Sequence, residues 1–296
     1  MKQKMKKSTK NNLIAYSFIA PNFIGYLIFT LIPVVCTFFL SLCEWNAGNI
    51  FAFIGFENYQ RMVKNSTFRI SLFNTLYYAV GTVPITMVCS LALAWLLNSK
   101  IKGMTIFRSA IFFPHVAAVV AIAAVWNMLF NPDMGPVNMM LSSLGVKNPP
   151  RWAASTDWSM PVVILASIWR NVGYYMIIYL AGLQGIPSEL YEAAKMDGAS
   201  GWQRFRKITL PMLTPITFFV SIMLTISCFK VFDLIYTMTE GGPGRSTNVL
   251  VMHIYDSAFT EYKFGYASAV ATVLFFIVLI VTLIQFRAER KWSEYM

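Results

Sequence analysis

Ionisable side chains occur within long apolar stretches of the sequence, where each could contact a polar solute or an ion: His115, Arg170, Lys230 and Asp233. An ionisable group surrounded by lipid is energetically costly, so it is a candidate functional residue by default. Two alternatives stay open for Lys230 and Asp233, namely side chains that extend to the membrane surface and an ion pair that fixes helix packing. Arg170 lies about nine residues inside its stretch, roughly 13 Å deep at about 1.5 Å per residue, so the first alternative suits it less well.

The segment around Arg170 is unusually polar and aromatic for the middle of an apolar stretch. From Trp169 to Tyr175 the sequence is Trp-Arg-Asn-Val-Gly-Tyr-Tyr. Carbohydrates are bound by this combination of groups, because aromatic rings contact their C–H faces while amide and hydroxyl groups bond their hydroxyls. The residue types therefore indicate a binding region for a sugar or a similar polar solute.

The other reactive residue types form no catalytic or metal-binding pattern. The cysteines Cys36, Cys43, Cys89 and Cys228 contain no CxxC pair, and all but Cys43 lie in apolar segments. We therefore expect them to behave as small hydrophobic residues, with neither a disulfide nor a metal site. The two histidines have no metal-type cluster around them, which argues against a membrane-embedded enzyme.

The sequence predicts no ATP binding by this chain. A P-loop requires the pattern G-x-x-x-x-G-K-[ST], which does not occur. The segment Gly241–Thr247 is superficially similar, but it has Arg245 in place of lysine and contains a proline, so we interpret it as a turn. If the activity of this protein is driven by ATP, the nucleotide and its Mg²⁺ must bind to separate subunits, and we expect no cofactor on this chain.

The composition indicates a protein whose solvent is lipid. Hydrophobic residues make up 57% of the 296 residues and charged residues only 12%, against roughly 25% charged residues in a soluble domain. Six stretches reach the roughly 20 residues that a transmembrane helix needs. They are about residues 13–42, 73–97, 109–130, 161–183, 213–236 and 267–286. Helices satisfy their own backbone polar groups in lipid, so we predict an all-α integral membrane fold with about six transmembrane helices.

Two alternative explanations of these stretches are less suitable. The runs are too long and too continuous for the alternating strands of a membrane barrel. The first stretch, residues 13–42, is also much longer than the apolar core of a signal peptide, so we expect an uncleaved first span.

The distribution of Lys and Arg predicts the orientation. One set of flanks holds 15 of the 24 positive residues, and it comprises 1–12, 98–108, 184–210 and 287–296. The other set holds 7 in longer loops, and it comprises 43–72, 131–160 and 237–266. The positive-inside rule then places both termini in the cytoplasm. We predict a basic N-terminus, 1–12, a six-helix transmembrane domain, 13–286, and a basic tail, 287–296.

The net charge of +11 could also indicate nucleic-acid binding. Because the positive residues cluster beside apolar runs, membrane topology is the better explanation, and we expect no nucleic-acid partner. The three outer loops are rich in aromatic residues. This enrichment favours either an interfacial aromatic belt or a platform for an external partner, and both interpretations stay open.

The longest inner loop, residues 185–211, begins with the pattern of a short helix. Pro187 and Ser188 favour a helix start, and Glu189 follows in the first turn, where the helix dipole favours an anion. Gly198 is suited to end the helix, because glycine readily adopts the left-handed backbone conformation of a C-terminal cap. The sequence therefore predicts a helix followed by a sharp bend.

A second short helix should follow over residues 201–208. Ser200 and Gln203 have the spacing of a capping box at its start. On the first helix, Ala193 and Ala194 keep one side nearly flat, which allows another backbone to approach closely. The alternative is an ordinary structured loop, but a helical knob with a smooth face is better suited to a partner's groove.

This segment resembles the coupling motif of permease subunits in binding-protein-dependent ABC importers. The family's motif is Glu-Ala-Ala, then Asp-Gly-Ala, then Ile-x-Leu-Pro, and here it is Glu192-Ala193-Ala194, Asp197-Gly198-Ala199 and Ile208-Thr209-Leu210-Pro211. Three matching residues alone would be a weak signal, but the whole pattern extends over about 20 residues of an inner loop. The resemblance implies that the ATPase-coupling residues are Glu192, Ala193, Ala194, Asp197, Gly198, Ala199, Leu210 and Pro211.

The resemblance also implies the partner proteins and the cellular location. Such a permease pairs with a second permease subunit, and two ATP-binding subunits carry ATP and Mg²⁺. An extracellular solute-binding protein delivers the solute. The chain is then expected in the bacterial cell membrane, surrounded by the lipid bilayer.

Further motifs are similar to the sugar-uptake branch of this family, the maltose, glycerol-3-phosphate and multiple-sugar permeases. They are Ile54–Tyr59, Asn74-Thr75, Gly241–Pro243, Ala258-Phe259 and Gly265–Ala269. The chain resembles the first of the two permease kinds, because its short basic tail lacks the Gly-rich motif common in the second. The resemblance to the maltose permease implies that His115, Asn171, Tyr174 and the neighbourhood of Cys228 to Val231, which contains Phe229 and Lys230, line the pathway. Arg170 and Asp233 are added because each is an ionisable residue within a predicted span. The residue types differ from those of the maltose permease at several of these positions, so the resemblance does not identify the solute.

The main rival interpretation is a secondary transporter driven by an ion gradient. It would need carboxylates along an ion path and usually an internal repeat. Asp233 is the only acidic residue in the predicted spans, and the sequence has no convincing repeat. An ATP-driven importer of a sugar or related polar solute is therefore the preferred interpretation.

Overall fold

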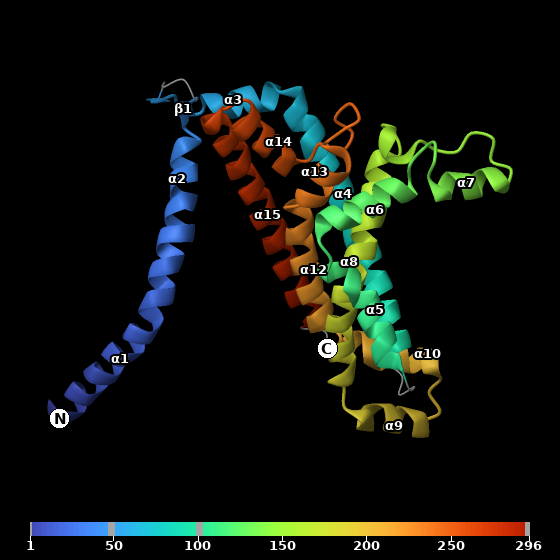
Figure 1. The fold of residues 1–296 in the computed structure, drawn as a ribbon. Coiled ribbons are helices and arrows are strands. Elements are labelled where there is room, and N and C mark those ends of the chain that lie inside the picture. The colour runs from blue at the N-terminus through green and yellow to red at the C-terminus, as the bar shows by residue number, and fades with distance from the viewer. Residues whose placement is uncertain (1, 47–50, 99–102, 294–296) are drawn as a thin grey trace. The chain divides into compact units, whose positions relative to one another are not determined.

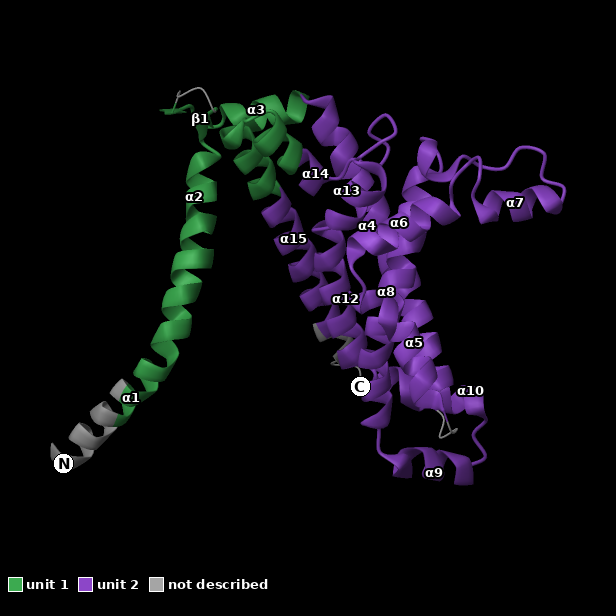
Figure 2. Cartoon of the chain, viewed as in Figure 1, with its two compact units in different colours: residues 1–64, 254–273 green, residues 65–253, 274–296 purple. Residues whose placement is uncertain are grey.

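The chain divides into two units in the computed structural model, which describes residues 2–46, 51–98 and 103–293. Unit 1 comprises residues 1–64 and 254–273, and unit 2 comprises residues 65–253 and 274–296 (Figure 2). All of the candidate coupling and pathway residues lie in unit 2.

Unit 1 begins with a long helical rod, which is apolar from Ile14 onward (Figure 1). Helix α1 (Lys2–Tyr26) continues through a π-helical turn, Leu27–Leu31, into α2 (Ile32–Leu40). The stretch Ile14–Leu40 has 27 residues with a mean hydropathy of 2.3, and none of its most apolar window is buried against this chain. A helix of this length and composition can cross a bilayer, which agrees with the first predicted span.

A small ribbon follows the rod. Strand β1 (Cys43–Trp45) pairs antiparallel with β2 (Phe51–Phe53), and α3 (Glu57–Lys64) comes next. The buried side chain of Asn58 donates hydrogen bonds to the carbonyls of Ser41 (3.0 Å) and Cys43 (2.9 Å). Asn58 therefore fastens α3 to the ribbon. These two three-residue strands are the exception to an otherwise helical fold.

The core of unit 2 is the pair of long helices α4 (Ser66–Leu97) and α8 (Ser159–Gln184), which lie side by side (Figure 1). Polar side chains connect them within this apolar setting. The hydroxyl of Tyr78 donates to Ser167 Oγ at 2.6 Å, and Ser90 donates to the carbonyl of Val172 at 2.9 Å. Hydrogen bonds of this kind join helices in lipid, where apolar contacts alone supply little driving force.

The predicted span 109–130 is wrong as a single straight helix. Helix α5 (Met104–Val116) and helix α6 (Val119–Leu129) meet at 98°. The backbone between them is extended, with ψ 147° at Ala117. The two halves pack on different partners, because α5 contacts α8 while α6 contacts α13 (Asp233–Thr239). Tertiary packing therefore holds the bend.

The predicted span 213–236 is also interrupted. Helix α12 (Thr214–Phe229) ends at Phe229, and Phe232 has a non-helical backbone (φ −145°, ψ −60°) before α13 begins. At its other end, α12 meets the preceding helical segment, Gly201–Met212, at 63°. The exposed Lys230 lies at this interruption, so the fifth predicted helix is shorter than expected and is followed by a separate helix.

Within the described residues, four helices are long and apolar enough to cross a membrane, and up to six if each bent pair is one span. The four are Ile14–Leu40, Ser66–Leu97, Ser159–Gln184 and Phe264–Glu289. The prediction of about six spans agrees with the larger count. The helices not yet introduced are α7 (Pro136–Ser143), α9 (Ser188–Met196), α10 (Gly201–Arg204), α11 (Leu210–Met212), α14 (Leu250–Tyr255) and α15 (Phe264–Ser293).

The loop over residues 131–158 is built around one buried amide. Asn138 donates to the carbonyls of Pro132 (2.8 Å) and Pro150 (3.0 Å), and its oxygen accepts from Trp152 Nε1 at 2.5 Å. Aromatic rings continue from here in edge-to-face and stacked contacts through Trp158, Trp152, Phe130, Trp126 and Trp169. Trp152 and Trp158 of the loop are thereby connected to the end of α6 and to α8.

Candidate functional site

The coupling segment forms the helix–bend–helix that its sequence predicts. Helix α9 ends where Gly198 adopts φ +75°, and the amide of Ala199 donates to the carbonyl of Ala194 at 2.9 Å. The left-handed backbone conformation is unfavourable by about 1–2 kcal/mol for a residue with a Cβ, but not for glycine. The glycine therefore sets the sharp end of α9.

The second helix starts with the predicted capping box. The amide of Gln203 donates to Ser200 Oγ (3.3 Å), and the amide of Ser200 donates to Gln203 Oε1 (2.7 Å). Only α10 is α-helical, because residues 205–209 form a π-helical turn before α11. The predicted helix over 201–208 is therefore confirmed as helical, but its second half is a π-helix and not an α-helix.

Helix α9 presents most of the motif to its surroundings. Glu192, Ala193, Asp197 and Gly198 are exposed, and Met196 is 88% exposed. Ala194, Ala199 and Pro211 are half-buried, while Leu210 is exposed at the start of α11. This exposure suits a docking surface, because apolar side chains such as Met196 have no cover within the chain.

Tyr191 joins α9 to the base of the next helix, and the sequence analysis missed it. Its hydroxyl lies 2.9 Å from the hydroxyl of Thr209, which is 2% exposed. Thr209 occupies the variable position of the Ile-x-Leu-Pro motif. This hydrogen bond joins α9 to the segment that leads into α12. No local pattern in the sequence points to this contact, since it joins positions 18 residues apart.

Two of the predicted pathway residues lie face to face in the middle of unit 2. The rings of His115 on α5 and Tyr174 on α8 stack with centroids 4.4 Å apart and an interplanar angle of 16°. A close helix crossing makes this possible, because a Cβ at Gly173 would lie 2.0 Å from the carbonyl oxygen of Ile111. Only glycine allows the two backbones to approach this closely.

Polar groups surround this ring pair. Asn171 donates to the carbonyl and hydroxyl oxygens of Ser167 at 2.9 Å and 3.2 Å, and Ser167 also accepts from Tyr78. In the described part of the chain, the buried Nε of Arg170 and the buried Nδ1 of His115 have no hydrogen-bond partner. Buried nitrogens without a hydrogen-bond partner are uncommon, so they mark this region as a candidate polar site.

The remaining predicted pathway residues lie at the interruption between α12 and α13. Phe229 is buried, with 4% of its surface exposed, whereas Lys230 and Asp233 are exposed. The ion pairs among the described residues join Arg61 to Glu44 and Glu57, and Lys263 to Glu261, so Lys230 and Asp233 do not pair. The ion-pair alternative for these two residues is therefore wrong in this structure.

Two motifs that are far apart in the sequence meet at the start of α4. Asn74 donates to the carbonyls of Arg245 and Asn248, both at 2.9 Å. The amide of Leu250 donates to the hydroxyl of Thr75 at 2.9 Å. The Asn-Thr pair thus holds residues 240–249 against α4, and the glycine-rich part of this loop is a turn, as predicted.

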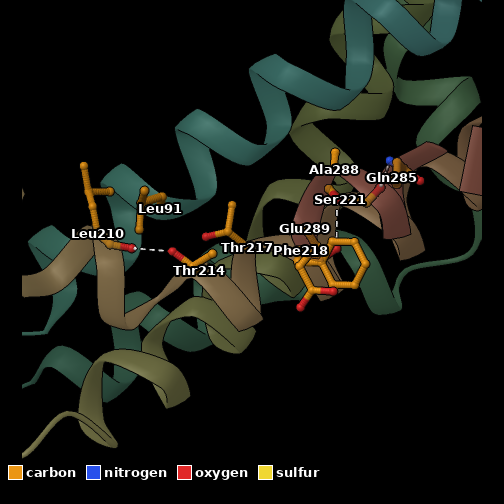
Figure 3. A pocket seen from close by; sticks show the side chains of 9 residues that line it. All are labelled: Leu91, Leu210, Thr214, Thr217, Phe218, Ser221, Gln285, Ala288 and Glu289. Carbon is orange, nitrogen blue, oxygen red and sulfur yellow. Dashed lines mark hydrogen bonds between the residues drawn. The ribbon is translucent and has the colours of Figure 1, made fainter. Parts of the chain in front are cut away.

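The sequence analysis also missed an apolar pocket of about 370 Å³ between α4, the α11–α12 bend and α15 (Figure 3). Its lining residues are Leu91, Leu210, Thr214, Thr217, Phe218, Ser221, Gln285, Ala288 and Glu289. Leu210 of the coupling motif belongs to this lining, and its carbonyl accepts from Thr214 at 3.3 Å. The residues come from three separate segments of the chain, so no single stretch of sequence signals the pocket.

Comparisons with known proteins agree on one family. The family described as the inner membrane component of binding-protein-dependent transport systems matches residues 62–294. The probable ABC transporter permease protein YesP of Bacillus subtilis is 38% identical over 298 residues, covering 98% of this chain and 96% of that protein. The lactose transport system permease protein LacF of Rhizobium radiobacter is 37% identical, covering 93% of each. A bacterial alginate ABC transporter, solved in complex with an alginate pentasaccharide-bound periplasmic protein, has the same fold, with a TM-score of 0.86 at 23% identity over 96% of both chains.

Proposed function

Because the chain belongs to the family of inner-membrane components of binding-protein-dependent transport systems, we propose that it forms half of the route by which an ATP-driven importer carries a sugar or related polar solute. It is the permease of an ABC transporter and not the ATPase, and it is an integral multi-pass membrane protein. The observation that carries the proposal is the exposed helix α9 with its coupling motif, at the opposite end of unit 2 from the outer helix α7 (Figure 1).

The ring pair of His115 and Tyr174 supports a carbohydrate as the solute. Tyr174 offers an aromatic ring, and Asn171 and Arg170 add hydrogen-bond donors on the same helix, α8. This is the combination that sugar rings require. The name of the Rhizobium radiobacter relative, a lactose permease, points to the same class.

The proposed complex contains a second permease, two ATP-binding subunits and an external binding protein. ATP and Mg²⁺ bind to the ATPase subunits, since this chain has no P-loop. The coupling residues of α9 and the Leu210-Pro211 pair transmit ATPase closure to the spans through the Tyr191–Thr209 contact. The route then alternates between inward-open and outward-open states, and each ligand favours one state through its differential affinity.

The proposed orientation has both termini in the cytoplasm, with 1–12 and 287–296 as basic ends of the permease domain 13–286. It rests on the excess of Lys and Arg in the flanks that include α9. In this orientation Met196 faces the cytoplasm and Met134, which is 82% exposed, faces outward. Phe229, Lys230 and Asp233 stay proposed pathway residues at the outer end of α12.

Cysteine cross-linking tests the orientation and the docking together. A Met196→Cys variant should cross-link to a single-cysteine ATPase subunit in the assembled complex, and the cross-link should respond to ATP. Met134→Cys is the matched control, because it is equally exposed but lies in the loop around α7. Labelling of Met196→Cys from outside intact cells, or equal cross-linking of both variants, would contradict the proposal.

Two substitutions test coupling directly. Glu192→Lys reverses an exposed charge on α9, and Gly198→Asp forces a side chain into the φ +75° position. Both substitutions should uncouple ATP hydrolysis from solute uptake in proteoliposomes, while membrane insertion is unchanged. If both variants take up solute and hydrolyse ATP at wild-type rates, the proposed coupling role of α9 is wrong.

A further inference from the structure

A polar pocket lies between the end of α9 and the helical segment that follows it. Its volume is about 420 Å³, and its lining residues are Ala194, Asp197, Gly198, Ala199, Gln203, Arg204, Lys207 and Ile208. Four of these residues belong to the coupling motif's first two blocks. The left-handed turn at Gly198 forms one wall, so the sharp end of α9 creates the pocket.

The pocket has more positive than negative charge. Arg204 and Lys207 line it against a single carboxylate, that of Asp197. The Nε of Arg204 is fully enclosed and has no hydrogen-bond partner among the residues that the structure describes. The ion pairs found in the described part of the chain involve neither cation. An enclosed guanidinium nitrogen without an acceptor is expensive, and an entering anion would satisfy it.

We propose that this pocket receives a carboxylate side chain of the ATPase subunit and so helps the permease select its own ATPase. The inference rests on the proposed docking of α9. A partner seated on the exposed face of α9 covers the pocket mouth, since Asp197 and Gly198 belong to both. Arginine and carboxylate form paired, charge-assisted hydrogen bonds, which match a planar acceptor better than a lone lysine could.

The test measures how tightly the purified ATPase subunit binds the permease pair in nanodiscs. Arg204→Gln and Lys207→Gln remove one positive charge each. Arg206→Gln is the matched control, because Arg206 is an exposed cation between the two but does not line the pocket. The bilayer is neutral phosphatidylcholine, which excludes an anionic headgroup as the ligand.

Arg204→Gln should weaken ATPase binding about tenfold or more, as expected when one member of a buried charge pair is removed. Lys207→Gln should weaken it less, and Arg206→Gln should match the wild type. The dissociation constant should also rise less steeply with NaCl concentration in Arg204→Gln than in the wild type. A merely structural role for Arg204 would lower affinity without changing this salt dependence.

A genetic readout identifies the source of the carboxylate. Arg204→Glu should be rescued by an Asp→Lys or Glu→Lys substitution in the ATPase subunit. Any of three results would overturn the inference. The first is an unchanged affinity of Arg204→Gln for the ATPase subunit, and the second is a loss of affinity confined to bilayers that contain phosphatidylglycerol. The third is competition with ATPase binding by inorganic phosphate that exceeds the effect of chloride at equal ionic strength. Cross-linking of Met196→Cys to the ATPase in the same samples separates this failure from failure of the proposed function.

Discussion

The close crossing of α5 and α8 at Gly173 provides the sharpest quantitative test of the site. In Gly173→Ala the added Cβ would lie 2.0 Å from the carbonyl oxygen of Ile111 and 2.8 Å from the Cα of Phe112. Both atoms are backbone, so no side chain can rotate away. A carbon–oxygen contact needs about 3.3 Å, so the helices must separate by about 1.3 Å.

The separation has two calculable effects. Overpacking of this kind destabilises a well-packed core by about 1–3 kcal/mol. Because His115 lies four residues beyond Ile111 on the same helix, its ring moves away from Tyr174, with which it now stacks at 4.4 Å. Loss of the aromatic contact, worth about 0.5–1.5 kcal/mol, should add to the destabilisation, and the displaced ring should weaken solute binding.

Gly81→Ala is the matched control. Gly81 also faces a neighbouring helix, but its added Cβ would meet the Cδ1 of Ile164 at 2.9 Å, and this side-chain end can rotate. The assays are the melting temperature of the purified complex and solute uptake into proteoliposomes. Gly173→Ala should lower both, and Gly81→Ala should lower neither by much. A Gly173→Ala complex with wild-type melting and uptake would refute the argued backbone contact.

Three further predictions concern single residues. Tyr174→Ala should lower solute uptake without lowering assembly with the second permease, because it removes one ring of the stacked pair; unchanged uptake would exclude the ring from the site. Asn74→Ala should release the turn over residues 240–249 from α4, so a protease added on the outer side of the complex should cut this turn faster than in the wild type. Equal rates of cutting would show that the hydrogen bonds of Asn74 do not hold the turn in place. Gly198→Ala should destabilise the end of α9 by about 1 kcal/mol, and Gly198→Asn by less, because asparagine tolerates the left-handed region; ATPase activity stimulated by the binding protein should follow this order.

Local patterns in the sequence predicted the local structure well. Ser200 and Gln203 form their capping box, and Gly198 ends α9, because both depend only on residues a few positions away. Hydropathy located the membrane-spanning stretches for a similar reason, since each span needs a continuous apolar run. The start of α4 was set seven residues too late, because its first turns, from Ser66, are too polar for that signal.

The bends and the polar contacts between helices needed the three-dimensional structure. Ala117 and Ala118 favour a helix by propensity, yet they form the break between α5 and α6 because the two halves pack on different helices. The Tyr78–Ser167 hydrogen bond joins positions 89 residues apart, and no spacing rule connects them. Lys230 and Asp233 appeared to lie within one span only because the interruption at Phe232 has an apolar sequence.

The attachment of the turn over residues 240–249 to α4 has a mechanical consequence. Both amide hydrogens of Asn74 are occupied by carbonyls of the turn, and Thr75 accepts from the backbone just beyond it. We therefore expect a displacement of the turn to move the adjoining part of α4 with it. Because α4 extends over 32 residues and donates from Ser90 to the carbonyl of Val172 on α8, we expect such a displacement to reach α8 as well.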